Sequence, residues 1–200
     1  MPPTVLIAGT WGDYQEESWW RPGSPFVREA VRHGVHLLDP GDPFRWSTRL
    51  DGLMGGNAEW ELSGEVLKWY CHAKAPGETV NLIAHSHGGQ VAAYALARGL
   101  KVGTLVTVAT PVRRDMEDVY QRACLRNGLP RCVHRWVHIH TDRRDLWQWF
   151  GELGDGLLGI RRGMPAPAEN VSEPGRDHGS LLDPALWTSR GWWEWVREEV

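Results

Sequence analysis

The sequence predicts an α/β fold in which a mainly parallel sheet lies between two layers of helices, a three-layer α/β/α sandwich. Short apolar segments alternate along the chain with segments of helical periodicity, and this alternation is typical of a parallel sheet covered on both faces. The 200 residues suit a single domain over positions 1–200 with a sizeable core. Right-handed crossovers then predict the strand order 2-1-3-4-5.

The first part of the chain supplies two strands and two helices. Residues 5–8 form an apolar strand that ends in Gly9-Thr10-Trp11-Gly12, and residues 35–38 form a second strand before a Pro- and Gly-rich turn. A short helix is expected over 25–33. Residues 58–73 form a longer helix, because their large apolar side chains recur at helical spacing until Pro76-Gly77.

The remainder of the chain continues the alternation. The expected strands are 79–84, 104–109 and 135–140, with a short strand near 170–171. The expected helices are 90–98, 114–126 and a closing helix over 191–199.

The strand over 79–84 runs into a turn that suits a nucleophilic serine. Ser86 stands between His85 and His87 and is followed by Gly88-Gly89. A sharp strand-to-helix turn exposes a serine rigidly and points the first N–H groups of the helix at a forming oxyanion. Serine is also a preferred helix N-cap, but the buried strand before it and the Ala-rich helix after it favour a nucleophile.

A second loop is expected at the same edge of the sheet, because ligands bind beyond the carboxyl ends of parallel strands. Ester hydrolysis needs two N–H donors aimed at the oxyanion. His87 supplies one, as the residue after the nucleophile. Thr10 is the candidate for the other and Trp11 is second. The alternative is that Gly9-Thr10 is a plain strand-ending turn.

A general base and an acid should follow the serine in the order acid, then histidine. His178 lies in a polar loop and is the only histidine after residue 140. Asp142 and Asp145 both follow the strand over 135–140, and either carboxylate could orient the imidazole. Asp115, after the preceding strand, is the next candidate.

These motifs resemble the α/β-hydrolases of the lipase/esterase type. The resemblance lies in the Gly9-Thr10-Trp11 loop, Trp20-Arg21-Pro22-Gly23-Ser24-Pro25-Phe26, Phe44-Arg45-Trp46-Ser47, the Ala84–Gly89 elbow, Ala109-Thr110-Pro111 and Asp177-His178. The elbow and Ala-Thr-Pro are its most specific parts. Two departures are Ala84, where the pattern Gly-x-Ser-x-Gly has its first glycine, and Ala8, where a histidine is usual before Gly9.

The resemblance implies a minimal α/β-hydrolase fold without a large cap domain, in which 112–132 is long enough for a small lid. It also implies hydrolysis of a carboxylic ester through an acyl-enzyme, with Ser86, His178 and an acid as the triad. Asp145 is followed by Leu146 and Trp147, which is similar to the pattern after this strand in related enzymes, so it is favoured over Asp142.

Two other classes of function stay open. His138-Ile139-His140-Thr141-Asp142 spells His-x-His-x-Asp, which suits a zinc ligand set and a metal-dependent hydrolase. The motif comes late and Arg143 follows it, which weakens that interpretation. A non-catalytic binding module on the same fold is the other alternative.

The composition excludes several partners. The formal charge of −3 lacks the basic excess of nucleic-acid binding, and no run of 18 apolar residues could span a membrane. A strand from Thr4 leaves no room for a signal peptide, and three cysteines without metal-type spacing suggest reduced thiols in the cytoplasm.

The expected substrate is a small-molecule ester with an apolar acyl or aryl group, and no metal or organic cofactor is expected. This prediction depends on the tryptophans in the loops around the serine, which are Trp11, Trp19, Trp20, Trp46, Trp147 and Trp149.

Overall fold

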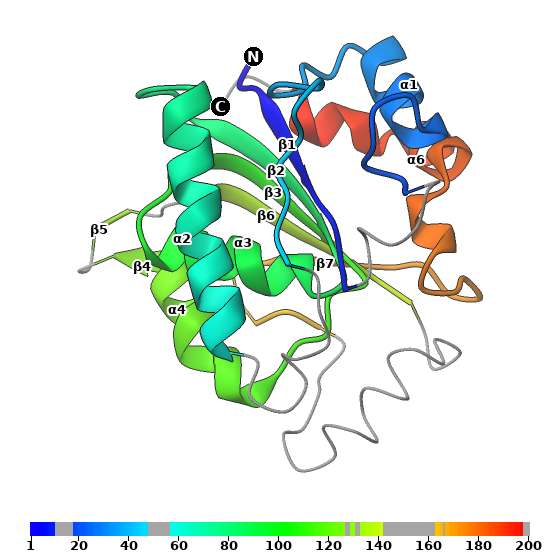
Figure 1. Ribbon diagram of the computed structural model, residues 1–200. Coiled ribbons are helices and arrows are strands. Elements are labelled where there is room, and N and C mark those ends of the chain that lie inside the picture. The colour runs from blue at the N-terminus through cyan, green and yellow to red at the C-terminus, as the bar shows by residue number, and fades with distance from the viewer. Residues whose placement is uncertain are drawn as a thin grey trace.

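A parallel sheet forms the centre of the computed structural model (Figure 1). The structure describes residues 1–10, 18–47, 57–126, 129–130, 133–141, 163–165 and 167–197. In these ranges the sheet has five strands, β1 (Thr4–Ile7), β2 (Val80–His85), β3 (Val102–Val108), β6 (Val133–His140) and β7 (Glu169–Ser172). Their order is β1-β2-β3-β6-β7 and every neighbouring pair is parallel.

The expected strand over 35–38 is reduced to a single bridge. Leu37 pairs with Thr4 in parallel, on the edge of β1 away from β2. The backbone N–H of Thr4 donates to His36 O at 2.7 Å, and that of Leu38 donates to Thr4 O at 2.8 Å. The strand stops there because Asp39 turns the chain with a φ of 43° and Pro40 has no N–H to donate. The segment thus occupies the predicted position in the sheet order, but it is wrong as a full strand.

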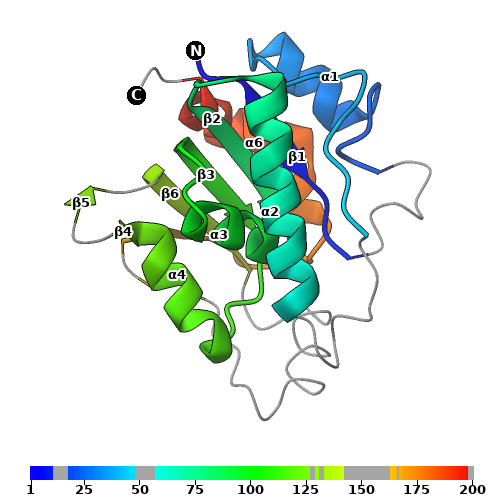
Figure 2. The same cartoon turned by 60° about the vertical axis from the view of Figure 1, so that its left-hand side comes forward.

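Helices cover both faces of the sheet, which confirms the three-layer α/β/α architecture. Figures 1 and 2 show α2 (Asn57–Lys74), α3 (Gly88–Ala97) and α4 (Glu117–Cys124) on one face. The opposite face carries α1 (Pro25–Arg32), α6 (Pro184–Arg190) and the 3-10 helices η3 (Ser180–Leu182) and η4 (Trp192–Val196).

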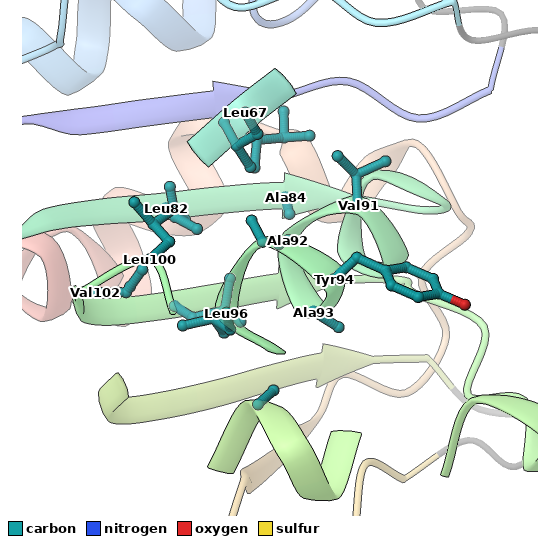
Figure 3. Packing of buried hydrophobic residues seen from close by; sticks show 14 of the residues in the cluster. Leu67, Leu82, Ala84, Val91, Ala92, Ala93, Tyr94, Leu96, Leu100 and Val102 are labelled. Carbon is teal, nitrogen blue, oxygen red and sulfur yellow. The ribbon is translucent and has the colours of Figure 1, made fainter. Parts of the chain in front are cut away.

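The alternation of side chains along β2 divides the core between the two faces. Leu82 and Ala84 belong to the cluster beneath α2, α3 and α4, whereas Ile83 belongs to the opposite cluster. Figure 3 shows Leu82 and Ala84 close to the alanine-rich α3. Burial of each large aliphatic side chain contributes roughly 1.5–3 kcal/mol.

Close packing between α2 and α3 fixes the position of the helix that follows Ser86. A Cβ added to Gly64 of α2 would lie 2.6 Å from Tyr94 Cβ and 2.9 Å from Ala95 N of α3. Only a glycine therefore lets the two helices approach to this distance.

The predicted closing helix over 191–199 is confirmed in part, as the short 3-10 helix η4 over Trp192–Val196. The α-helix lies earlier, over Pro184–Arg190, and the Asp183 side chain caps it by accepting from Ala185 N at 2.9 Å. Gly191 ends it in the left-handed region with a φ of 68°, and the chain continues as the 3-10 helix η4. The tryptophan-rich stretch after Gly191 therefore continues as a tighter helix.

The expected helix over 114–126 is divided into three parts. A 3-10 turn, η2 (Arg114–Met116), leads into α4, and β4 (Leu125–Arg126) then pairs with β5 (Leu129–Pro130) in an antiparallel hairpin. Met116, Val119, Tyr120 and Ala123 are buried in the core beneath α2 and α3. The lid over 112–132 stays a prediction, and its opening would have to expose these four side chains.

Two further observations concern membrane-spanning helices and the cysteine thiols. None of the helices in the described ranges is both long and apolar enough to cross a membrane. Cys71 is a free, buried thiol, and burial raises its pKa to about 12, so it is a poor nucleophile.

Candidate active site

Ser86 occupies a tight turn between β2 and α3. Its φ is 52°, a left-handed conformation that costs a residue with a side chain about 1–3 kcal/mol. Two backbone hydrogen bonds hold the turn, from Ser86 N to Val108 O at 2.9 Å and from Gly89 N to Ser86 O at 3.0 Å. The residue that precedes α3 is His87, so the interpretation of Ser86 as the N-cap of this helix is wrong.

The two glycines after Ser86 are required because backbone atoms at the end of β1 and the Thr110 side chain after β3 lie against this turn. A Cβ on Gly88 would lie 2.5 Å from Ala8 O and 2.7 Å from Ile7 O, and one on Gly89 would lie 2.2 Å from Thr110 Oγ1. Ser86 therefore lies on a strand–turn–helix elbow that packs tightly against the ends of β1 and β3.

The loop after β1 lies directly beside the serine. A Cβ added to Gly9 would lie 2.7 Å from Ser86 Cβ. A hydrogen bond of 2.6 Å joins Thr10 Oγ1 to His87 Nδ1, and the indole N–H of Trp46 donates to Ala8 O at 2.9 Å. The two residues expected to supply oxyanion donors, Thr10 and His87, are thus brought together. Trp11 lies outside the described residues.

His178 also lies at the elbow, 92 positions after Ser86 in the chain. Its ring centroid is 4.6 Å from that of His85, at an interplanar angle of 59°. A hydrogen bond of 3.2 Å joins His85 Nε2 to the backbone oxygen of His178. The described contacts of His178 with the elbow therefore run through His85, the residue directly before the serine.

A side-chain turn shapes the loop that carries His178. Ser180 N donates to Asp177 Oδ1 at 2.7 Å, and Asp177 N donates to Ser180 Oγ at 2.9 Å. These reciprocal bonds bridge the histidine and lead the chain into η3. The loop therefore has a defined conformation where it passes the elbow.

The two favoured acids, Asp142 and Asp145, lie outside the described residues. Thr141, the last described residue before them, is fully buried just after β6. Both carboxylates thus follow the carboxyl end of a strand in the same sheet as Ser86. Their assignment stays a prediction.

Asp115, the third candidate, is engaged elsewhere. Its carboxylate accepts from Arg113 Nε and Nη2 at 2.9 and 2.8 Å and from Asn57 Nδ2 at 2.9 Å. Burial opposes its ionisation, but the hydrogen bonds from Arg113 and Asn57 outweigh burial and hold the pKa of the carboxyl below its usual value. Asp115 thus fixes Arg113 in the described structure.

The two histidines of the His-x-His-x-Asp motif lie on one face of β6, as expected. His138 is fully buried, its Nδ1 is 2.9 Å from Thr107 Oγ1, and its ring stacks on His140 at 5.7 Å. Asp142 lies outside the described residues, among which no group of three metal-ligating side chains gathers.

His87 has neighbours that sequence reasoning missed. Its ring stacks on Trp60 of α2 at 5.1 Å and 18°, and the Arg113 guanidinium lies 5.0 Å from the centre of the Trp60 ring. Burial, with smaller electrostatic contributions from His178 and Arg113, lowers the pKa of His87 to about 4. Arg113 follows the carboxyl end of β3, and that position could have indicated it.

The tryptophans expected around the serine fall into three groups. Trp19 approaches His85, with ring centroids 6.3 Å apart. Trp20 and Trp46 are buried in the two core clusters, 2% and 6% exposed, and their place in the wall of a pocket around Ser86 stays a prediction. Trp11, Trp147 and Trp149 lie outside the described residues.

No family model and no curated sequence matches the chain, but solved structures do. A protein described as a predicted CIB-like hydrolase from Thermoplasma acidophilum aligns with a TM-score of 0.55 and 10% identity, over 98% of this chain and 86% of that chain. An esterase from Pyrococcus furiosus aligns with a TM-score of 0.53 and 14% identity over 98% and 82%, and one from Rhodococcus sp. ECU1013 with 0.52 and 15% over 98% and 91%.

At these identities the similarity concerns the fold. The parallel sheet, the two helical layers and the elbow after β2 are those of the α/β-hydrolases, and the solved structures align over nearly the whole chain. The chain therefore has a minimal α/β-hydrolase fold, as the sequence predicted.

Proposed function

We propose that the protein is a serine hydrolase that cleaves carboxylic esters. The observation that carries the proposal is the position of Ser86, at a φ of 52° between a parallel strand and a helix, with the Gly9–Thr10 loop against its Cβ. A strained elbow of this kind presents a serine hydroxyl rigidly to a substrate. The esterase names of several structural neighbours support the same class of reaction.

In the proposed reaction Ser86 Oγ attacks the carbonyl carbon of the ester while His178 takes the hydroxyl proton. The backbone N–H groups of His87 and Thr10 stabilise the oxyanion of the tetrahedral intermediate. The alkoxide leaves with the proton from His178, and the acyl group stays on Ser86 Oγ. Water, deprotonated by His178, then releases the acid and restores the serine.

Asp145, in preference to Asp142, is proposed to accept a hydrogen bond from His178 and to stabilise the imidazolium. The substrate is proposed to be a small-molecule ester with an apolar acyl or aryl group. Trp19 supports an apolar group on the substrate, because its ring lies beside His85.

The test compares ester hydrolysis by the wild type, Ser86→Ala, His178→Ala and Ser172→Ala, with p-nitrophenyl esters as substrates. Ser172 is an exposed serine of β7 and serves as the control. We expect Ser86→Ala and His178→Ala each to lower kcat by several orders of magnitude, with the double variant little worse than either. Wild-type activity should survive EDTA. Activity that persists in Ser86→Ala but is lost with EDTA would favour the histidines of β6 instead.

A further inference from the structure

Three segments that are distant in the sequence converge around the imidazole of His87. Thr10 comes from the loop after β1, Trp60 from α2, and Arg113 from the loop after β3. The reaction proposed above uses only the backbone N–H of His87 and leaves its side chain without a role. The contacts of that side chain define one.

The stack behind His87 is buried and held by hydrogen bonds. The rings of His87 and Trp60 lie nearly parallel, and Trp60 is only 2% exposed. The Arg113 guanidinium packs over the Trp60 ring, is itself 5% exposed, and is fixed by two hydrogen bonds to Asp115. Asn57, at the start of α2, donates to the same carboxylate. Aromatic stacking and cation–π contacts both stabilise buried groups of this kind.

The outer side of His87 holds the oxyanion loop. Its Nδ1 lies 2.6 Å from Thr10 Oγ1, and this is a hydrogen bond between residues 77 positions apart. Gly9, directly before Thr10, already touches the Ser86 side chain. The position of the Thr10 backbone beside Ser86 is therefore linked to the position of the His87 ring.

We propose that Trp60 and Arg113 are positioning residues that hold the His87 imidazole against the Thr10 hydroxyl, and thereby hold the Thr10 backbone N–H in place at Ser86. This inference rests on the proposed function, because it assigns Thr10 to the oxyanion hole. Neither Trp60 nor Arg113 touches the reacting atoms in this mechanism; both act through His87.

The protonation of His87 fits this role. With its pKa lowered to about 4, the ring is neutral around pH 7, and in the tautomer that carries the ring proton on Nε2 its Nδ1 can accept a hydrogen bond from the Thr10 hydroxyl. Burial is the main cause of the lowered pKa, with smaller contributions from His178 and Arg113, and the charge of Arg113 is balanced by Asp115. Removal of the Trp60 ring or of the Arg113 charge should raise the pKa of His87 towards its usual 6.5.

The first experiment measures kcat and KM for p-nitrophenyl acetate in Thr10→Val, which removes the hydroxyl at nearly constant volume. We expect kcat to fall about tenfold or more with little change in KM, because a misplaced oxyanion donor weakens transition-state binding. Thr10→Ser, which keeps the hydroxyl, should lose much less. Equal kcat in Thr10→Val and wild type, or a loss confined to KM, would overturn the proposal.

The second experiment follows the imidazole nitrogens of His87 by 15N NMR in Trp60→Leu and Arg113→Gln. Trp69→Leu on the exposed side of α2, where Trp69 is 71% exposed, and Arg114→Gln, at an exposed neighbour of Arg113, are matched controls. We expect a higher His87 pKa and a lower kcat in the first pair and neither change in the controls. Trp60→Phe, which keeps an aromatic ring, should retain more kcat than Trp60→Leu.

The outcomes separate the two proposals. If the wild type neither hydrolyses the ester nor reacts with a fluorophosphonate, the proposed function is contradicted, while the 15N shift of Nδ1 in Thr10→Val still tests the bond to His87. An Nδ1 shift identical in wild type and Thr10→Val would contradict that bond. If Trp60→Leu does not fold, Thr10→Val and Arg113→Gln still test whether these contacts position His87 and Thr10.

Discussion

Ser86 keeps a side chain at a backbone conformation that glycine adopts more easily. Its φ of 52° places Cβ in the strained left-handed region, and the ladder bond to Val108 and the packing against Gly9 hold it there. Strain of this kind is typical of functional positions, where stability is given up for the exposure of one group.

We therefore expect Ser86→Gly to abolish ester hydrolysis and yet to raise the free energy of unfolding by about 1 kcal/mol. The comparison is Ser172→Gly in β7, where the backbone is extended and glycine should destabilise by roughly 0.5–1 kcal/mol. Urea unfolding measures both. A loss of stability in Ser86→Gly as large as that in Ser172→Gly would mean that the serine is not strained.

The acid is decided by single asparagine variants. Replacement of the true acid should lower kcat by about 10⁴, because the imidazole then takes the wrong tautomer without moving. We expect this loss in Asp145→Asn, and a small effect in Asp142→Asn, as for a solvated surface charge. Asp115→Asn tests the third candidate acid, whose carboxylate accepts hydrogen bonds from Arg113 and Asn57. Small losses in Asp142→Asn and Asp145→Asn alike would place the acid elsewhere.

At the scale of the elements, the elbow depends on where the helix after Ser86 meets β1. The backbone oxygens of Ile7 and Ala8 lie within 2.7 Å of a Cβ built on Gly88. Backbone oxygens at the end of β1 cannot move aside as the end of a flexible side chain can. Any side chain at this position must displace either the strand or the first turn of α3.

Gly88→Ala should therefore destabilise the fold by about 1–3 kcal/mol, the usual cost of overpacking. Gly41→Ala is the control, because a Cβ there would meet no atom closer than 3.9 Å and its φ is not positive. The midpoints of urea unfolding compare the two. An equal, small change in both variants would show that β1 and α3 are not in close contact.

The periodicity of the sequence predicted most elements because buried parallel strands and amphipathic helices leave plain patterns. It failed where one residue ends an element: Asp39 stops the strand expected over 35–38, and Gly191 divides the closing helix. The elbow and Thr10 were predictable because strand ends share one edge of a parallel sheet. The role of Trp60 could not be predicted, because helical periodicity marks it only as a core residue and gives no sign of its contacts with His87 and Arg113.

At the scale of the whole molecule, α4 is part of the packed helical layer. Three of its side chains, Val119, Tyr120 and Ala123, and Met116 of the preceding turn are buried with α3. A lid that opens on lipid would have to leave these contacts and expose apolar surface to water. Because these four side chains are buried, we expect the segment 112–132 to stay packed against α3.

We expect no jump in activity when a p-nitrophenyl ester passes from solution into an emulsion. Over a series of acyl chains, each added methylene should contribute less than the roughly 0.8 kcal/mol of full burial, so kcat/KM should rise over short chains and then level off. A sharp interfacial increase would instead identify the segment 112–132 as a working lid that carries α4 with it.

The most direct measurement is the site of covalent reaction with a fluorophosphonate, read by mass spectrometry of the digested protein. We expect one phosphonyl group on the peptide that carries Ser86, no such adduct in Ser86→Ala, and full labelling of Ser172→Ala. Labelling of a different serine, or unchanged labelling of Ser86→Ala, would contradict the assignment of Ser86 as the nucleophile.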